Sequence, residues 1–395
     1  MEMDAKNYAN GTYKVLICDL VGLKFDEKGE PDPGEVRQYI EGLGEVFHLG
    51  GIQTAATFDA GRIHFFYQPN LSTENELLTE TSDGRYDAVI AAATVIPKQS
   101  VFSVAGVRIG TGTGNMQSSS WGGGDGRGGN AVLMNTPGIN SRATAQMAIR
   151  ALLRFTPDLP FDTLHHLVMA GSFDTGRDLR RFPTEKIDGK RLTVFGYGNI
   201  GREVARLGKA FGMSVTVYAR EHHRDKIEAE GFHFSGDAAA AASGANAISV
   251  HVGLGSFDPQ LNHYGNAGFI GDEILSAMAD GGVLINFDRG EVVDVVALDR
   301  AMARGKIASA AIDADIFRSD DGVQSGPLVP FIPLARKYSG RLLLLPHVAA
   351  DTDHPSRVAG AKQAVDQIVT ALRERRASNL RGDLPEDFSP CGSAS

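Results

Sequence analysis

Cysteine is nearly absent from this chain of 395 residues: only Cys18 and Cys391 occur, one near each end. Two cysteines so far apart provide neither a disulfide framework nor the spacing of a metal site, so we expect no bound metal and a reducing compartment, the cytoplasm. The first residues, MEMDAKNYANG, do not follow the charged-then-apolar order of a signal peptide. The longest apolar runs, such as Leu342–Leu345, are far too short to cross a bilayer, so no membrane partner is expected.

An excess of positive charge is also missing. The formal net charge is −9, from 39 Lys and Arg against 48 Asp and Glu. Without a basic excess to neutralise phosphates, nucleic acid is not an expected partner, although a local cationic pocket is compatible with this charge. The length favours two domains.

From Lys190 onward, short apolar runs alternate with helical patterns. This alternation predicts a parallel sheet with helices on both faces. A helix over Asp294–Arg304 should begin at a capping Asp and end at Gly305. The expected strands are Arg191–Phe195, Ser214–Tyr218, Ala247–Val252, Val283–Asn286, Ala308–Ile312 and Leu342–Leu345.

The N-terminal third shows a looser α/β pattern. Its expected strands are Val15–Cys18, Ala88–Ala91 and Val107–Ile109. The apolar stripe of Ser141–Phe155 predicts a helix that connects the two halves. A helix near Ser356–Arg375 should follow the last strand, and the polar tail Ala377–Ser395 is expected to be mobile.

Residues 121–130, WGGGDGRGGN, form one glycine-rich stretch. We interpret it as a surface loop, because a phosphate-binding loop would normally open a helix and none follows directly. An alternative is that Trp121 and this loop close over a substrate.

The segment FGYGNIG places Gly196, Gly198 and Gly201 in a G-x-G-x-x-G pattern between a predicted strand and a predicted helix. The first glycine makes the tight turn, the second lets the backbone approach a pyrophosphate, and the third permits close packing of helix and strand. The helix N-terminus then offers N–H groups to the anion. We therefore predict that a dinucleotide contacts Gly196, Tyr197, Gly198, Asn199, Ile200 and Gly201.

The next strand ends in VYAREHHR, where a nucleotide-binding strand often carries a carboxylate for the adenine ribose. Here Ala219 and Arg220 stand in its place, so a 2′-phosphate would meet cations instead of a negative charge. This favours NADP, while Glu221 could turn back to the ribose and keep NAD acceptable. A solvated start of a helix is the structural alternative, and we do not expect a metal at the histidine pair. The candidate phosphate ligands are Arg220, His222, His223 and Arg224.

Between Ala88 and Ala350 the sequence resembles the D-isomer-specific 2-hydroxyacid dehydrogenases, and most closely their D-3-phosphoglycerate dehydrogenase branch. The motifs are RIGTGTGN at 108–115, FGYGNIG at 195–201, INFDRGEVVD at 285–294 and LPHVAA at 345–350. The resemblance implies two Rossmann-like domains with doubly wound parallel sheets. The cofactor domain, 141–347, would be inserted into a substrate domain formed by 1–140 and 348–395, with the active site in the cleft between them and a homodimer as the assembly.

Oxidation of a 2-hydroxy acid requires a cation for the carboxylate and the C2 oxygen, a base for the hydroxyl proton, and a carboxylate that orients the base. By resemblance, the cation is Arg289 and the base is His347. The resemblance also implies that the backbone at Thr111 and Gly112 binds the substrate carboxylate.

The third catalytic group departs from the family pattern. The family places Glu five residues after the Asp of an Asp-Val-Phe/Tyr segment, but AIDADIFRSDDG, residues 311–322, contains no Glu. Counting from Asp313 reaches Arg318, which could not orient a protonated histidine. Counting from Asp315 reaches Asp320, which we predict as the orienting carboxylate, with Asp321 as the alternative.

Two further residues lie near the cofactor by resemblance, His251 and Asp313. The proline that normally follows this histidine is replaced by Gly253, and we interpret His251 as structural.

The expected function is hydride transfer between NADP(H), or NAD(H), and C2 of a small 2-hydroxy or 2-oxo acid. The missing Glu favours an alternative, a dinucleotide-sensing binding protein similar to the corepressors of the family. In the phosphoglycerate branch an arginine commonly precedes a threonine where this chain reads Ala91–Thr94. The absent cation weakens the case for a phosphorylated substrate.

Overall fold

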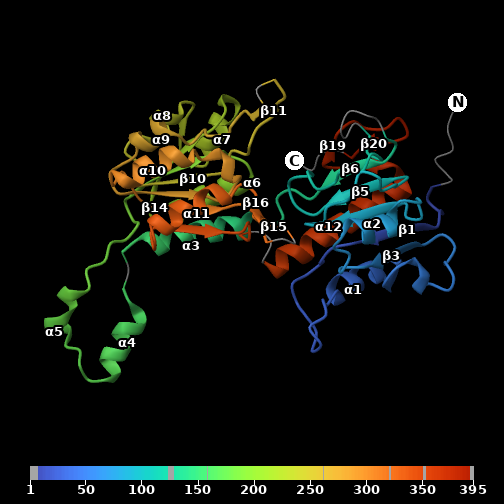
Figure 1. Ribbon diagram of the computed structural model, residues 1–395, viewed down its shortest axis with the longest axis horizontal. Coiled ribbons are helices and arrows are strands. Elements are labelled where there is room, and N and C mark those ends of the chain that lie inside the picture. The colour runs from blue at the N-terminus through green and yellow to red at the C-terminus, as the bar shows by residue number, and fades with distance from the viewer. Residues whose placement is uncertain are drawn as a thin grey trace. The chain divides into compact units, whose positions relative to one another are not determined.

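The computed structural model divides the chain into two compact units. Unit 1 comprises Met1–Asn140 and Asp351–Ser395, and unit 2 comprises Ser141–Ala350 (Figure 1). Which unit holds substrate and which holds cofactor stays a prediction. The structure describes residues 8–122, 129–157, 159–260, 262–319, 322–349 and 353–391.

Unit 1 is built on a sheet whose described strands run in the order β19-β6-β5-β4-β1-β3-β2. All neighbours are parallel except β19, which is antiparallel to β6. The strands are β1 (Tyr13–Ile17), β2 (Val46–Leu49), β3 (Ile63–Tyr67), β4 (Ala88–Ala91), β5 (Ala105–Arg108), β6 (Val132–Asn135) and β19 (Leu380–Arg381).

Both faces of this sheet are buried, because successive side chains of a strand point to opposite faces. Val15 and Ile17 of β1 pack in one apolar cluster, and Leu16 packs in another. Helices α1 (Gly34–Gly42) and α12 (His354–Glu374) contribute to the first cluster. Helix α2 (Glu74–Thr81) contributes Leu77 to the second. The C-terminal helix therefore completes the core of the N-terminal unit.

The C-terminal segment differs from the mobile tail predicted over Ala377–Ser395. Through Cys391 it is folded as β18 (Arg376–Ala377), β19 and β20 (Ser389–Pro390). Phe388 is buried in the core of unit 1, and Leu384 packs against that core. A few apolar side chains thus anchor a segment whose average composition is polar.

Unit 2 contains a sheet of described strands in the order β17-β14-β13-β10-β7-β8-β9, all parallel. The first strand in sequence, β7, lies between β8 and β10. The chain therefore adds β8 and β9 on one side of β7, and then crosses to the other side to add β10 and the strands that follow. The strands are β7 (Arg191–Phe195), β8 (Ser214–Tyr218), β9 (His233–Ser235), β10 (Ala247–Val250), β13 (Gly282–Asn286), β14 (Ile307–Asp313) and β17 (Leu342–Leu345). Every strand predicted here is confirmed to within two residues at each end.

Helices cover both faces of the second sheet, as the alternation predicted. Leu284 of β13 packs in one apolar cluster and the neighbouring Ile285 in another. The Ile285 face is covered by α3 (Ser141–Phe155), α6 (Asn199–Ala210) and α7 (Arg224–Ala229). The Leu284 face is covered by α8 (Ala238–Ala242), α9 (Asp272–Ala277), α10 (Val295–Ala303) and α11 (Ile332–Lys337).

Additional elements extend from this frame. Hairpins β11–β12 (Phe257–Asp258 with His263–Tyr264) and β15–β16 (Phe317–Arg318 with Gln324–Ser325) follow β10 and β14. Between α3 and β7 the chain forms α4 (Phe161–Met169) and α5 (Thr175–Asp178), which stand apart from the sheet in Figure 1. In the described part of the chain, no helix combines the length and apolar composition that a bilayer crossing needs.

The indole of Trp121 does not form a free lid. It is 2% exposed, its Nε1 donates to the carbonyl of Met116 at 2.9 Å, and its ring stacks on Phe102. The alternative in which Trp121 closes over a substrate is therefore wrong. Residues 123–128 of the glycine-rich stretch lie outside the described residues.

Candidate active site

Two glycines of the turn between β7 and α6 lie directly against backbone atoms. Gly196 has φ 100°, and a Cβ atom at this position would overlap the carbonyl oxygen of His251. A Cβ atom at Gly201 would overlap the carbonyl oxygen of Gly196. Both positions therefore require glycine, the first for its conformation and the second for close approach of helix to strand.

Gly198 has a different environment that fits a pyrophosphate. A Cβ atom there would have no neighbour within 4 Å, so the space beside this backbone is open. Gly198 is also the N-cap of α6, and no side chain caps the first turn of that helix. Uncapped N–H groups at a helix N-terminus bind anions. The turn follows β7, and the strand order reverses between β7 and its neighbour β10. Doubly wound sheets bind dinucleotides at such a switch point.

The three residues between these glycines have mixed surroundings. Tyr197 is buried, Ile200 is half-buried against the core, and Asn199 is exposed as the first residue of α6. Their predicted contacts with a dinucleotide are not tested by this packing, and they stay predictions.

Arg224, one of the predicted phosphate ligands, is held by side chains that lie close to it in the fold. Its Nε donates to Glu221 Oε1 at 2.5 Å, its Nη2 to Glu221 Oε2 at 3.2 Å, and its Nη1 to Glu228 at 3.4 Å. Its guanidinium also lies over the ring of Phe234, 4.2 Å from the centroid. The same ion pair lowers the pKa of Glu221, so this carboxylate is engaged with Arg224.

Arg220 has a different environment. Its side chain is exposed, and among the described residues no ion pair involves it. The rings of His222 and His223 lie 4.0 Å apart. Burial, together with the charges of His222 and Arg220, lowers the pKa of His223. In this segment Arg220 is therefore the cation best placed to accept a new anion.

The predicted cation and base are brought together by a carboxylate. Asp315 Oδ1 lies 3.2 Å from His347 Nδ1, and Asp315 Oδ2 lies 3.7 Å from Arg289 Nη1. The side chains of Arg289, Asp315 and His347 are 47%, 33% and 36% exposed, so all three are open to a ligand. Each follows the carboxyl end of one of the adjacent parallel strands β13, β14 and β17, and such ends meet at one edge of a sheet.

The carboxylate observed beside His347 is Asp315, five residues before the predicted Asp320. Both Asp320 and its alternative, Asp321, lie outside the described residues. Sheet register explains the position of Asp315: Asp313 pairs with Leu345 across β14 and β17. Two residues further along each chain are Asp315 and His347. This register could have identified Asp315 from the sequence once β14 and β17 were taken as neighbours.

Asp313 holds the backbone that directly follows His347. It is 2% exposed, and its Oδ1 and Oδ2 accept hydrogen bonds from the backbone N–H groups of Val348 (2.9 Å) and Ala349 (3.1 Å). These bonds fix the chain directly after His347, which has φ 54°. A non-glycine residue in this region is strained and persists only when its surroundings hold it. Contact between Asp313 and the cofactor stays a prediction.

Asp288 is a site residue that sequence reasoning missed. Its Oδ2 accepts the N–H of Gly253 and its Oδ1 accepts the N–H of Arg289, both at 2.8 Å. A proline at position 253 would have no N–H to donate. Gly253, which stands where the family has proline, therefore forms a hydrogen bond with Asp288. This bond links the loop after β10 to the loop that carries Arg289. Burial raises the pKa of Asp288.

His251 is buried, as its structural interpretation predicts. Its Nε2 lies 2.8 Å from Ser249 Oγ, and burial lowers its pKa to about 3. The ring is therefore neutral near pH 7, and its predicted place beside the cofactor stays a prediction.

In unit 1, the predicted substrate turn follows β5. Thr111 and Gly112 are exposed, and a Cβ atom at Gly112 would have no neighbour within 4 Å. The carbonyl of Thr111 accepts hydrogen bonds from Asn135 and Arg381. The turn is thus anchored through its carbonyl, and an open backbone faces solvent.

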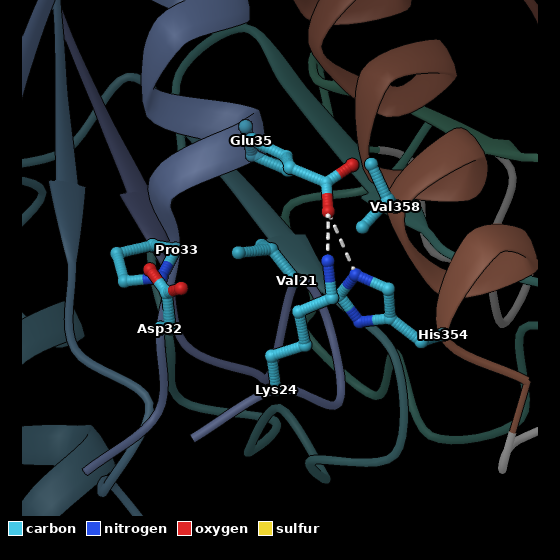
Figure 2. A pocket seen from close by; sticks show the side chains of 8 residues that line it. Val21, Lys24, Asp32, Pro33, Glu35, His354 and Val358 are labelled. Atoms are coloured by element: carbon cyan, nitrogen blue, oxygen red, sulfur yellow. Dashed lines mark hydrogen bonds and ion pairs between the residues drawn. The ribbon is translucent and has the colours of Figure 1, made fainter. Parts of the chain in front are cut away.

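A small hollow lies at the start of α12, where His354 holds the loop that follows β1 (Figure 2). His354 Nδ1 accepts the N–H of Leu23 at 2.8 Å, so the proton is on Nε2, which donates to Glu35 at 2.9 Å. Lys24 also contacts this carboxylate at 3.0 Å. The hydrogen bond from His354, and next that from Lys24, lower the pKa of Glu35 to about 2. Sequence reasoning did not identify this clamp.

Comparison with known proteins adds independent evidence. Residues 160–349 match the family model described as "D-isomer specific 2-hydroxyacid dehydrogenase, NAD binding domain". The D-3-phosphoglycerate dehydrogenase of Methanocaldococcus jannaschii is 28% identical over 250 residues, which cover 63% of this chain and 43% of that protein. The glyoxylate reductase of Aeropyrum pernix is 28% identical over 251 residues, covering 63% of this chain and 68% of that protein. The matched region thus spans less than half of the phosphoglycerate dehydrogenase.

Solved structures show the same fold. The glyoxylate reductase from Paecilomyes thermophila has a TM-score of 0.59 at 19% identity, covering 95% of this chain and 99% of that chain. The NADPH-dependent glyoxylate/hydroxypyruvate reductase from Sinorhizobium meliloti, in complex with NADP and malonate, has a TM-score of 0.57 at 20% identity, covering 94% and 98%. The motifs, the matched domain, the relatives and the fold thus make this chain similar to the D-isomer-specific 2-hydroxyacid dehydrogenases, and residues 160–349 match the NAD-binding domain of that family.

Proposed function

We propose that this protein transfers a hydride between NADP(H), or NAD(H), and C2 of a small 2-hydroxy or 2-oxo acid. The observation that carries the proposal is the contact of Asp315 with both His347 and Arg289 in the unit that also contains the glycine turn. A cation, a base and an orienting carboxylate are the set that this reaction requires. Similarity to the family supports the same proposal.

Each group has a distinct role. When bound, the nicotinamide supplies or accepts the hydride. Arg289 binds the substrate carboxylate and polarises the oxygen at C2. His347 exchanges a proton with that oxygen through Nε2, since its Nδ1 lies against Asp315. Asp315 orients the ring and stabilises the imidazolium, which is the form that donates the proton during reduction.

We propose NADP as the preferred cofactor because of Arg220. The family carboxylate is absent at this place, and Glu221 is engaged by Arg224. Arg220 would therefore meet a 2′-phosphate without a competing anion on the same loop, and charge-assisted bonds of this kind are strong. NAD remains a usable cofactor, since nothing in this contact set excludes the unphosphorylated ribose.

We propose that Thr111 and Gly112 bind the substrate carboxylate through their backbone, supported by the open space at Gly112. This is the contact that the family resemblance implies. The cytoplasmic location stays a prediction from the sequence.

We propose a homodimer in which α4 contacts a second copy of the chain. No residue of this helix is buried, and Phe161, Val168 and Met169 are 69%, 60% and 72% exposed. Apolar side chains grouped in this way are covered in most stable proteins. Light scattering should show a dimer for the wild type and a monomer for a variant with Asp at Val168 and Met169. A dimer in both would disprove the role of α4.

The enzymatic proposal is tested by following oxidation of NADPH with a panel of 2-oxo acids. We expect turnover by the wild type and by His233→Ala, whose histidine is exposed on β9, and none by His347→Ala. NADPH binding, measured by fluorescence, should persist in all three proteins. Tight NADPH binding without turnover of any acid by the wild type would favour the sensing protein instead. The carboxylate of Asp315 beside His347 supports the enzyme over that alternative.

A further inference from the structure

Arg289 is held mainly through its backbone. Its side chain is exposed, and the contact of its Nη1 with Asp315 Oδ2 is 3.7 Å, which is longer than a hydrogen bond. The backbone is held on both sides of this residue. The N–H of Arg289 donates to Asp288 Oδ1 at 2.8 Å, and its carbonyl accepts Nδ2 of Asn286 at 3.0 Å. The direction in which the guanidinium leaves the chain therefore depends on these two backbone contacts.

The residue after Arg289 lies against the neighbouring loop. A Cβ atom at Gly290 would lie 2.9 Å from Cβ of Ala314 and 3.2 Å from the carbonyl oxygen of Pro327. Ala314 directly precedes Asp315 in the chain. Residues 287–294, which we call the arginine loop, therefore pack closely on the segment that carries the orienting carboxylate.

Asp288 joins the arginine loop to the loop after β10. Its Oδ2 accepts the N–H of Gly253 at 2.8 Å, while its Oδ1 accepts the N–H of Arg289. The carbonyl of Gly253 in turn accepts Nδ2 of Asn266 at 3.0 Å, which closes the base of the β11–β12 hairpin. Asp288 itself is half-buried. One carboxylate thus accepts a backbone N–H from each of the two loops.

The two loops are also joined further along the chain, independently of Asp288. The contacts are from the N–H of Gly268 to the carbonyl of Glu291 (2.8 Å) and from the N–H of Ile270 to the carbonyl of Val292 (2.9 Å). These backbone bonds hold the part of the arginine loop that follows Arg289, whereas Asp288 holds the part that precedes it. Removal of the carboxylate should therefore release the orientation of Arg289 and leave the rest of the loop in place.

We infer that Asp288 is a positioning residue, which holds Arg289 in the arrangement that binds the carboxylate of the substrate. The inference rests on the proposed function and deepens it, and all of the contacts that support it lie within unit 2. Without Asp288 the arginine loop would populate several arrangements. The apparent affinity for a ligand falls with the fraction of protein that is competent to bind it, and saturating ligand restores the competent arrangement. The KM for the acid should therefore rise while kcat is largely kept.

The test measures kcat, the KM for the acid and the KM for NADPH. The acid is whichever of glyoxylate, pyruvate and 4-methyl-2-oxopentanoate the wild type turns over fastest. In Asp288→Ala the KM for the acid should rise about tenfold, as for a competent fraction of about one-tenth, with kcat lowered less than about threefold and the KM for NADPH changed less than about twofold. Asp280→Ala makes the same chemical change at an exposed carboxylate before β13, at the opposite end of the strand, and should leave all three values unchanged.

Two further measurements separate positioning from folding. Asp288→Asn keeps the volume and one accepting oxygen, so its KM for the acid should lie between those of the wild type and Asp288→Ala. Amide hydrogen exchange of the wild type needs no variant. The N–H groups of Gly253 and Arg289 should exchange about tenfold or more slowly than those of an unstructured peptide, because Asp288 accepts both.

A KM for the acid within about twofold of the wild-type value in folded Asp288→Ala would overturn the inference, because the competent fraction would then be nearly unaltered. A fall in kcat without a rise in this KM would overturn it as well. If the variants do not fold, unprotected exchange at both N–H groups of the wild type overturns it. Absence of turnover by the wild type with all three acids would refute the proposed function, whereas an unchanged KM beside normal wild-type turnover refutes the inference alone.

Discussion

Replacing Asp315 by Asn should slow turnover because the base loses its orienting charge. The contact between Asp315 and His347 Nδ1 is 3.2 Å, and both side chains are about one-third exposed. An ion pair between partly exposed side chains contributes up to about 1 kcal/mol, because solvent screens it. A loss of about 0.5–1 kcal/mol in the transition state lowers kcat by about two- to fivefold.

The assay is steady-state oxidation of NADPH by a 2-oxo acid across a range of pH. Reduction requires the imidazolium, which Asp315 stabilises, so the alkaline limb of the kcat profile should move to lower pH in Asp315→Asn. Asp315→Glu keeps the charge and should recover part of the lost rate. A purely structural role would lower the amount of folded protein without moving this limb.

Asp320→Asn is the matched comparison, since it makes the same chemical change at the carboxylate that family spacing predicts. We expect its kcat and its pH profile to stay close to those of the wild type. If Asp320→Asn loses activity and shifts the profile while Asp315→Asn does neither, the assignment of Asp315 is refuted.

Three further outcomes are expected. Arg220→Ala should lower the ratio of kcat/KM with NADP to kcat/KM with NAD by about tenfold or more, since a charge-assisted contact with the phosphate is lost. The control Arg224→Ala should change this ratio little. Equal changes in the ratio for the two variants would refute the assignment of Arg220. Burial raises the pKa of Asp288 above 3.8, so its contribution to stability is lost as pH rises through the folded pKa. The free energy of unfolding of Asp288→Asn relative to wild type, from urea titrations, should therefore become more favourable from about pH 4 towards neutrality, and a constant difference would contradict this. Phe388 is 7% exposed, so Phe388→Ala should reduce the free energy of unfolding of unit 1 by about 3–5 kcal/mol, and a loss under about 1 kcal/mol would show that the tail is not part of the core.

Six of the seven described strands in the large sheet of unit 2 could be predicted because their pattern is simple, and β9 was not. A strand buried on both faces is a continuous apolar run, as in Leu342–Leu345, and such runs stand out between helical segments. Strands β2, β3 and β6 of unit 1 were not predicted, and β2 and β3 each contain a histidine within an apolar run. The structure shows how these polar side chains are tolerated: His48 Nε2 lies 2.9 Å from His64 Nδ1, so each ring has a hydrogen-bond partner.

Candidate site residues that belong to a single motif could be named from the sequence. Arg289, His347 and the glycine turn depend on local sequence, and the structure brings Arg289 and His347 to one carboxylate. That carboxylate could not be chosen by counting along the chain, because it depends on how β14 and β17 are aligned across the sheet.

Contacts between distant segments could not be predicted either, because they also depend on how the strands and loops are arranged in space. The pairing of Asp288 with Gly253 and that of Asp19 with the turn at residues 92–94 each join residues far apart in sequence. Linear spacing contains no signal for such pairs. Arg224 is the opposite case: its partners Glu221 and Glu228 lie within four residues of it in the sequence, but the sequence analysis did not consider that they would engage its charge.

Hydride transfer to C2 is the central claim, and isotope transfer tests it most directly. NADPH that carries deuterium at C4 of the nicotinamide is incubated with the protein and a 2-oxo acid, and the product is analysed by mass spectrometry. We predict that the 2-hydroxy acid contains deuterium at C2. A product with solvent hydrogen at C2, or no product with any acid, would contradict the account.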